Sequence, residues 1–207
     1  MTRPAPHSLR VHLALFAVLV PAAAQAASDS CSGAPVTASL LGTRYAEASA
    51  YLTDYNHAED HGFAVGTAVN VPLTAHLDLG AAYAHSWFES DTAADRYDAL
   101  SVSLTAYTRC GRFSPFARAS LGYEWWTISN DPFYQLEAGS EYLVTDRLSV
   151  SAQVGWSEFL AEDWNGGSFG ASARANYWLT PTLAAAPTLG YSEGGNLTYG
   201  VSVVYRF

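Results

Sequence analysis

The sequence predicts an all-β fold: an antiparallel, up-and-down transmembrane β-barrel of ten strands, with eight strands as the alternative. Three observations predict it. The chain begins like an export signal, its remainder alternates apolar and small or polar residues, and no later apolar stretch is long enough for a membrane helix. Only 14% of the 207 residues are charged, whereas 49% are hydrophobic, a composition that suits lipid contact.

The first 26 residues resemble a signal peptide. Arg3 and Arg10 supply positive charge, residues 11–20 form a short apolar core, and Ala24-Gln25-Ala26 fits a cleavage site. An apolar core of this length cannot cross about 30 Å of hydrocarbon as a helix. We therefore expect 1–26 to be a signal peptide, 27–42 a periplasmic N-terminal segment and 43–207 the barrel.

Ten segments with a period of two follow, separated by turn residues. We expect strands at 43–55, 61–72, 76–89, 96–109, 113–127, 133–145, 147–160, 167–179, 182–193 and 196–207. In the last segment one face holds Leu197, Tyr199, Val201, Val203, Tyr205 and Phe207, and the other holds Asn196, Thr198, Gly200, Ser202, Val204 and Arg206.

The small and polar face is predicted to line the lumen, and the apolar face to meet lipid. Glycine and serine are poor strand formers on a solvated outer face, but inside a narrow barrel they leave room for long side chains. The long charged residues on this face form an expected interior charge network of Glu47, Arg118, Glu124, Glu137, Glu141 and Arg174. A hairpin around residues 129–130 would place Arg118 near Glu141 and Glu124 near Gln135 and Glu137. Because buried charges are costly unless paired, we expect a structural plug, with a narrow ion or solute path as the alternative.

The signal peptide, the alternating last segment and the terminal Phe207 of VSVVYRF together resemble small bacterial outer-membrane barrels of the OmpA-like and opacity-protein-like, porin-like superfamily. This resemblance implies a cell-envelope location in a Gram-negative outer membrane. It also implies that Tyr205 and Phe207 form the signal read by the outer-membrane assembly machinery. The chain differs from these families in its ten expected strands and its short loops.

Charge is expected to divide along the barrel axis. Acidic residues fall at the surface-loop end: Asp54, Glu59, Asp60, Glu89, Asp91, Asp95, Asp98, Asp131, Glu158, Glu162, Asp163 and Glu193. Basic residues fall at the periplasmic end: Arg44, Arg109, Arg112, Arg147 and Arg206. Such an acidic rim is either simply solvated or recruits divalent cations that bridge to lipopolysaccharide. The rim argues against a nucleic-acid partner.

Two further clusters could carry chemistry. His57, Glu59, Asp60 and His61 offer imidazole and carboxylate groups for Zn²⁺ or Ni²⁺, although their spacing matches no established metal motif, and a polar loop is the preferred interpretation. His85, Ser86 and Glu89 hold the residue types of a lipid A hydrolase. Adjacent strand residues point to opposite faces, however, so Ser86 and His85 cannot easily form a nucleophile–base pair.

Cys31 and Cys110 are the two cysteines of the chain. Export favours one disulfide between them, and both are expected on the periplasmic side; two thiols too far apart to bridge are the alternative.

The sequence therefore predicts a monomeric integral outer-membrane protein with a structural or envelope role, or a narrow pore. It is expected to contact outer-membrane lipids and lipopolysaccharide, to need no cofactor and not to be an enzyme. The alternatives are a surface-binding protein, acting through divalent cations or acidic loops, and a lipid A-modifying hydrolase.

Overall fold

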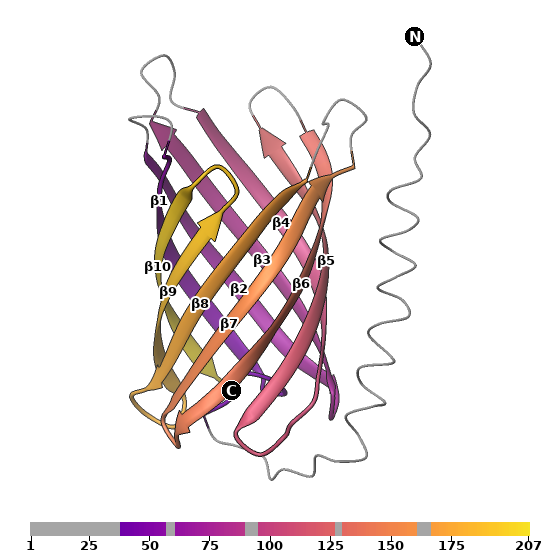
Figure 1. Cartoon of the computed structure of the whole chain (residues 1–207), viewed down its shortest axis with the longest axis vertical. Helices are drawn as coiled ribbons and strands as arrows, with labels where there is room; N and C mark the ends of the chain where they lie inside the picture. Colours follow the sequence, from indigo (N-terminus) through magenta and orange to yellow (C-terminus); the bar gives the residue numbers. More distant parts are fainter. Residues whose placement is uncertain (1–37, 57–60, 90–94, 127–129, 161–166) are drawn as a thin grey trace.

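The computed structural model describes residues 38–56, 61–89, 95–126, 130–160 and 167–207, and these form a closed barrel of tilted strands (Figure 1). The strands are β1 (Tyr45–Asp54), β2 (His61–Thr74), β3 (Leu77–Glu89), β4 (Asp95–Tyr107), β5 (Phe113–Trp126), β6 (Asn130–Thr145), β7 (Leu148–Phe159), β8 (Ser168–Trp178), β9 (Leu183–Ser192) and β10 (Asn196–Arg206). Across the described ranges there is no helix that is long and apolar enough to cross a membrane.

Every strand pairs antiparallel with its neighbour in the chain, and β1 also pairs with β10, which closes the ring. The predicted ten-stranded barrel is therefore confirmed, and the eight-stranded alternative was wrong. The predicted strand bounds agree to within three residues, the largest difference being the start of β6 at Asn130 rather than at 133. Alternation predicts strands well here because each strand has one face toward the lumen and one away from it.

The two ends of the barrel differ in their connections (Figure 1). Four short connections, 75–76, 108–112, 146–147 and 179–182, lie at the end that also holds the C-terminus. We call this the turn end. The opposite end, which holds the connections from β1 to β2, β3 to β4, β5 to β6, β7 to β8 and β9 to β10, is the loop end.

The apolar face of each strand points outward. In β10, Val201 and Val203 are 54% and 53% exposed, whereas Ser202 is 1% exposed and Val204 is buried. The same contrast holds in β4, where Val102 and Leu104 are exposed and Thr105 is buried. In a water-soluble protein the large apolar residues would be inside, so this inversion is the pattern of a barrel whose outer surface meets lipid.

Glycines on the lumen face make room for aromatic rings on the neighbouring strand. The Tyr51 ring lies against Gly200, and the Phe133 ring lies against Gly122, each pair directly opposed in the ladder. A Cβ atom at Gly200 would lie 2.2 Å from Tyr51, and one at Gly122 would lie 2.3 Å from Phe133. The predicted role of small residues in the lumen therefore has a specific form, which is the packing of rings over glycine backbone.

The two faces of β4 provide a test. Val102→Arg places a charge at the middle of the outer face, where we expect a loss of about 2–4 kcal/mol in the free energy of unfolding from lipid. Ser101→Arg places the same group in the lumen, beside Gly122 and Ala82. Urea unfolding in lipid vesicles measures both variants. Equal losses in both would contradict the assignment of the faces.

Candidate functional site: a lumen closed at the turn end

Residues 38–44 form a short segment that enters the barrel at its turn end before β1 begins; we call it the floor segment. Its backbone makes a turn in which the Thr43 amide donates to the Leu40 carbonyl at 3.3 Å. Gly42 has a φ of 71°, which favours glycine at the third position of such a turn. A Cβ atom at Gly42 would also collide with the side chains of Tyr107 and Arg109. Both the backbone conformation and the lack of space therefore favour glycine here.

One side of the floor segment is bound by residues of β2, β3 and the turn after β4. The Gly42 amide donates to Asp78 Oδ2 at 2.8 Å, and the Asn70 side chain donates to the Thr43 carbonyl at 2.9 Å. Asn70 also donates to Asp78 Oδ2 at 3.1 Å. Arg109 Nη2 donates to the Leu41 carbonyl at 2.8 Å. Asp78 is 2% exposed, so its carboxylate is shielded from solvent and bonds to the floor segment instead.

The other side is bound by Glu141 of β6. Glu141 Oε2 accepts from the Ser39 hydroxyl, and Oε1 accepts from the Leu40 amide at 3.3 Å and from the Ser149 hydroxyl at 2.8 Å. Both Glu141 and Ser39 are buried. Three donors therefore satisfy the oxygens of this buried carboxylate with hydrogen bonds.

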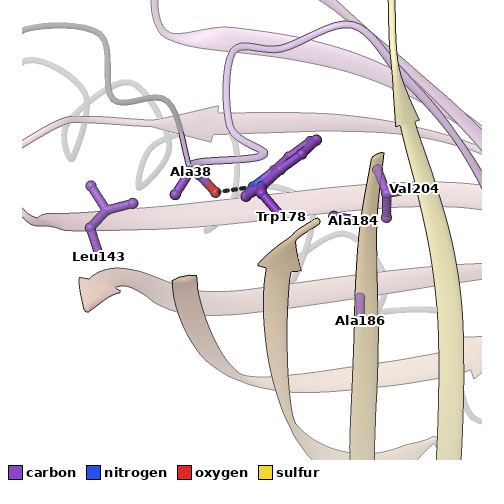
Figure 2. Packing of buried hydrophobic residues seen from close by; sticks show 6 residues of the cluster. All are labelled: Ala38, Leu143, Trp178, Ala184, Ala186 and Val204. Carbon is purple, nitrogen blue, oxygen red and sulfur yellow. Dashed lines mark hydrogen bonds between the residues drawn. The ribbon is translucent and has the colours of Figure 1, made fainter. Parts of the chain in front are cut away.

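Trp178, shown in Figure 2, and Arg206 complete the floor. Trp178 Nε1 donates to the Ala38 carbonyl at 2.9 Å, and Ala38 is fully buried in a cluster with Leu143, Trp178 and Val204. The Arg206 guanidinium lies 3.8 Å from the centre of the Trp178 ring and donates to the Ser39 carbonyl at 3.0 Å. The floor segment is thus held from β2, β3, β6, β8 and β10, on all sides of the ring.

Above the floor lies a lumen cavity of about 490 Å³, crossed by an ion pair. Arg174 of β8 makes a bidentate pair with Glu47 of β1, at 2.9 and 3.1 Å. Its Nε donates to Asn176 at 2.7 Å. The pair joins two strands that are not neighbours in the sheet, so it braces the barrel across its section.

A second group of polar side chains lies on the opposite wall. Arg118 Nε donates to Thr105 at 3.0 Å, and its Nη1 lies 3.4 Å from Glu137 Oε2. Glu137 also accepts from Gln153 at 2.6 Å. The expectation that Arg118 lies near Glu141 was wrong, because its directly opposed partner is Glu137.

The same difference in register changes the position of Glu124, which lies opposite Asp131 and not beside Gln135 and Glu137. The cause is the position of the hairpin: β5 ends at Trp126 and β6 starts at Asn130. The centre of the connection therefore lies before residues 129–130, the position expected from the sequence. All six predicted network residues nevertheless line the lumen, as their positions in the ladder require: Glu47, Arg118, Glu124, Glu137, Glu141 and Arg174.

Aromatic side chains line the lumen toward the loop end, which the sequence interpretation missed. They come from β3 to β7 and from the residue after β1: Tyr55, Phe88, Tyr97, Trp126, Phe133 and Phe159. Tyr97 and Trp126 stack with ring centres 4.6 Å apart, and Phe88 lies 5.5 Å from Tyr97. Burial raises the pKa of Tyr55 to about 12. A signal for these residues existed, because they share strand parity with small lumen residues.

The predicted metal cluster falls largely outside the described residues, which include only His61 of its four members; His57, Glu59 and Asp60 lie in the range 57–60. His61 is exposed and lies 3.7 Å from Asp54. Across the described ranges, no group of three or more His, Cys, Asp or Glu side chains could hold a metal ion.

The hydrolase candidates are separated by the sheet. Ser86 is 4% exposed and faces the lumen, whereas His85 faces outward, with its Nδ1 2.7 Å from Asp98 Oδ1. The Asp98 carboxylate also accepts from the Tyr83 hydroxyl. Ser86 and His85 therefore cannot act as one nucleophile–base pair. The side chain of Glu89 is not among those that the structure describes.

The acidic rim is less uniform than predicted. Asp98 and Glu158 lie on the outer face, where Glu158 accepts from the Tyr134 hydroxyl, and Asp131 is a buried lumen residue. Asp131 lies at the loop end, as predicted, but its side chain is buried in the lumen and is not part of an exposed rim. At the turn end, Arg109 and Arg206 bind the floor segment.

The remaining predicted residues lie at the turn end. Cys110 is disulfide-bonded, whereas Cys31 lies outside the described residues, so the Cys31–Cys110 pairing stays a prediction. Tyr205 and Phe207 point outward and are 53% and 62% exposed. Their role as an assembly signal is not tested by this geometry.

Comparison with known proteins agrees with the fold. No protein-family model matches the sequence, and no curated protein matches it. The translocator domain of autotransporter NalP from Neisseria meningitidis is similar in structure, at 12% identity and a TM-score of 0.50, over 95% of this chain and 98% of that chain. The β domain of the Bordetella autotransporter BrkA (10% identity, TM-score 0.48, 80% and 98% covered) and the KdgM porin (9%, 0.43, 80% and 99%) are also similar. At such identities the likeness shows the fold alone, and the resemblance to small outer-membrane barrels is confirmed at that level.

The brace across the lumen can be tested by removing one partner. Arg174→Met leaves Glu47 buried without its cation, and we expect a loss of about 3–5 kcal/mol in the free energy of unfolding. The double variant Glu47→Gln/Arg174→Met should recover part of the loss, since no charge is then stranded. Urea unfolding in detergent micelles measures these values.

The control is Arg147→Met in the exposed turn before β7, where a change within about 0.5 kcal/mol is expected. An Arg174→Met barrel as stable as this control would show that the pair does not brace the barrel.

Proposed function

We propose that the protein is an integral protein of the bacterial outer membrane with a structural role in the envelope, and that its lumen is closed to solutes. The observation that carries this proposal is the floor segment. Ala38, Ser39 and Leu41 are 0%, 2% and 7% exposed, and side chains from five strands hydrogen-bond to the floor segment across the turn end. A barrel used for free diffusion has no need for such a closure.

Two further observations support the location. The outer face is largely apolar, with charged residues such as Asp98 and Glu158 toward the loop end of their strands, and the closed ring leaves no strand edge unpaired in lipid. The N-terminal sequence fits an export signal. The proposed partners are therefore outer-membrane lipids, lipopolysaccharide and the assembly machinery, with the protein acting as a monomer.

The alternative function is a narrow pore, which would form if the floor segment left its place at the turn end. The 490 Å³ cavity is lined in part by the charged side chains of Glu47, Arg118 and Arg174 and borders the floor segment, so release of this segment would connect the cavity to the turn end. An enzymatic role is not proposed, since Ser86 and His85 face opposite sides of the wall.

The closure is tested by conductance in planar bilayers. The double variant Asp78→Leu/Glu141→Met keeps side-chain size but removes the acceptors for Ser39, Leu40 and Gly42. We expect the wild-type protein to show no stable current steps and the variant to show them, because the floor segment then loses its anchors. A gel of boiled and unboiled samples verifies that each barrel is folded.

The matched control is Thr188→Val, a lumen substitution in the cavity wall that touches none of these anchors; its hydroxyl has no hydrogen-bond partner among the described residues. It should stay silent. Steps of equal frequency in wild type and double variant would contradict a closed lumen and favour the pore.

A further inference from the structure

Two carboxylates lie directly opposite each other on the lumen wall near the loop end. Glu124 of β5 and Asp131 of β6 are ladder partners, and such residues have Cβ atoms about 4.5–5.5 Å apart. Like charges in this relation destabilise a sheet. Asp131 is only 9% exposed, so little water screens the repulsion. The pair therefore requires a compensating positive charge or a shared proton.

The described residues supply no such charge. Asp131 has no hydrogen-bond or ion-pair partner among them, and the carboxylate of Glu124 accepts only from Trp126 Nε1, at 3.0 Å. The nearest lumen arginine on the same strand, Arg118, is six residues away, about 20 Å along β5, and it faces Glu137. Arg174 is engaged with Glu47, on the far wall.

The surroundings of the pair are aromatic. Trp126, whose indole donates to Glu124, stacks on Tyr97, and Phe88 lies 5.9 Å from Trp126. Phe133 follows Asp131 on the same face of β6. Carboxylates beside aromatic rings are the groups that bind organic ammonium ions, through charge pairing and cation–π attraction. Two carboxylates and bound waters can also hold Mg²⁺, but aromatic rings offer a hard metal ion no oxygen ligand, so the aromatic lining favours an organic cation.

We propose that Glu124, Asp131 and the adjoining aromatic lining form a binding site for an organic ammonium group at the loop end of the lumen. The mostly buried Asp131, which has no hydrogen-bond or ion-pair partner among the described residues, supplies the charge, and the rings of Trp126 and Tyr97 supply a low-polarity wall. The site lies on the far side of the cavity from the floor segment, so it does not depend on whether the lumen is closed.

The test uses the full chain extracted from membranes in detergent, with tetramethylammonium chloride as the probe. Titration calorimetry at constant ionic strength, with sodium chloride as the reference salt, should show saturable binding. We expect Asp131→Asn and Glu124→Gln each to weaken binding at least about tenfold, and Trp126→Leu to weaken it about fivefold. Glu158→Gln, an acid at the same end but on the outer face, should bind like wild type.

A second measurement keeps the proposal testable if a variant binds nothing. Tetramethylammonium should raise the urea midpoint of the wild-type barrel, since a ligand of the folded state stabilises it. Without probe, Asp131→Asn should unfold at the same or a higher midpoint, because it removes a repulsion. Tighter binding of Mg²⁺ than of tetramethylammonium, with Trp126→Leu unaffected, would overturn the proposal in favour of a metal site. Absence of saturable binding in the folded wild type would overturn it in favour of a shared proton.

Discussion

The hydrogen-bond ladder between β1 and β10 is the constraint on which the rest of the structure depends. Lipid offers no partner to backbone amides and carbonyls, so a sheet that faces lipid must close on itself. The pairing of Tyr45 with Arg206 through Asp54 with Leu197 achieves this closure. Closure also fixes parity, because each residue then points either into the ring or away from it. Every property of the lumen, including its charges, its glycines and its aromatic rings, follows from that division.

Closure creates a confined interior that is lined by charged and polar side chains and is not a hydrocarbon core. Buried charges in such a space are stable only when other groups bond them. The lumen meets this requirement in different ways along its length. Arg174 pairs with Glu47, whereas Asp78 and Glu141 accept hydrogen bonds from backbone and hydroxyl donors of the floor segment. The floor segment therefore has two effects: it closes the turn end, and it donates hydrogen bonds to two buried carboxylates whose burial would otherwise cost more free energy.

Sequence alone predicted the strands and their faces because a period of two is a direct consequence of the pleat. It could not predict the register between β5 and β6. A slip by an even number of residues keeps every side chain on its face, so the pattern that identifies the lumen residues leaves the pairing of Arg118 undetermined. The floor segment was missed for a different reason. Residues 38–44 have no period, and their conformation depends on Asp78 and Glu141, which are distant in the chain.

The aromatic lining shows a third kind of limit. The sequence interpretation placed aromatic side chains at the lipid boundary, where Tyr83, Trp87 and Tyr199 indeed face outward. Trp126 and Tyr97 have the opposite parity and face the lumen, next to Glu124. Rings at a lipid boundary are explained by the boundary itself, but rings inside a polar lumen need another reason. Packing over Gly122 accounts for Phe133. Trp126 and Tyr97 oppose each other and not a glycine, so this kind of packing does not explain them. They lie beside the Glu124–Asp131 carboxylate pair, and an electrostatic role next to these carboxylates accounts for their position.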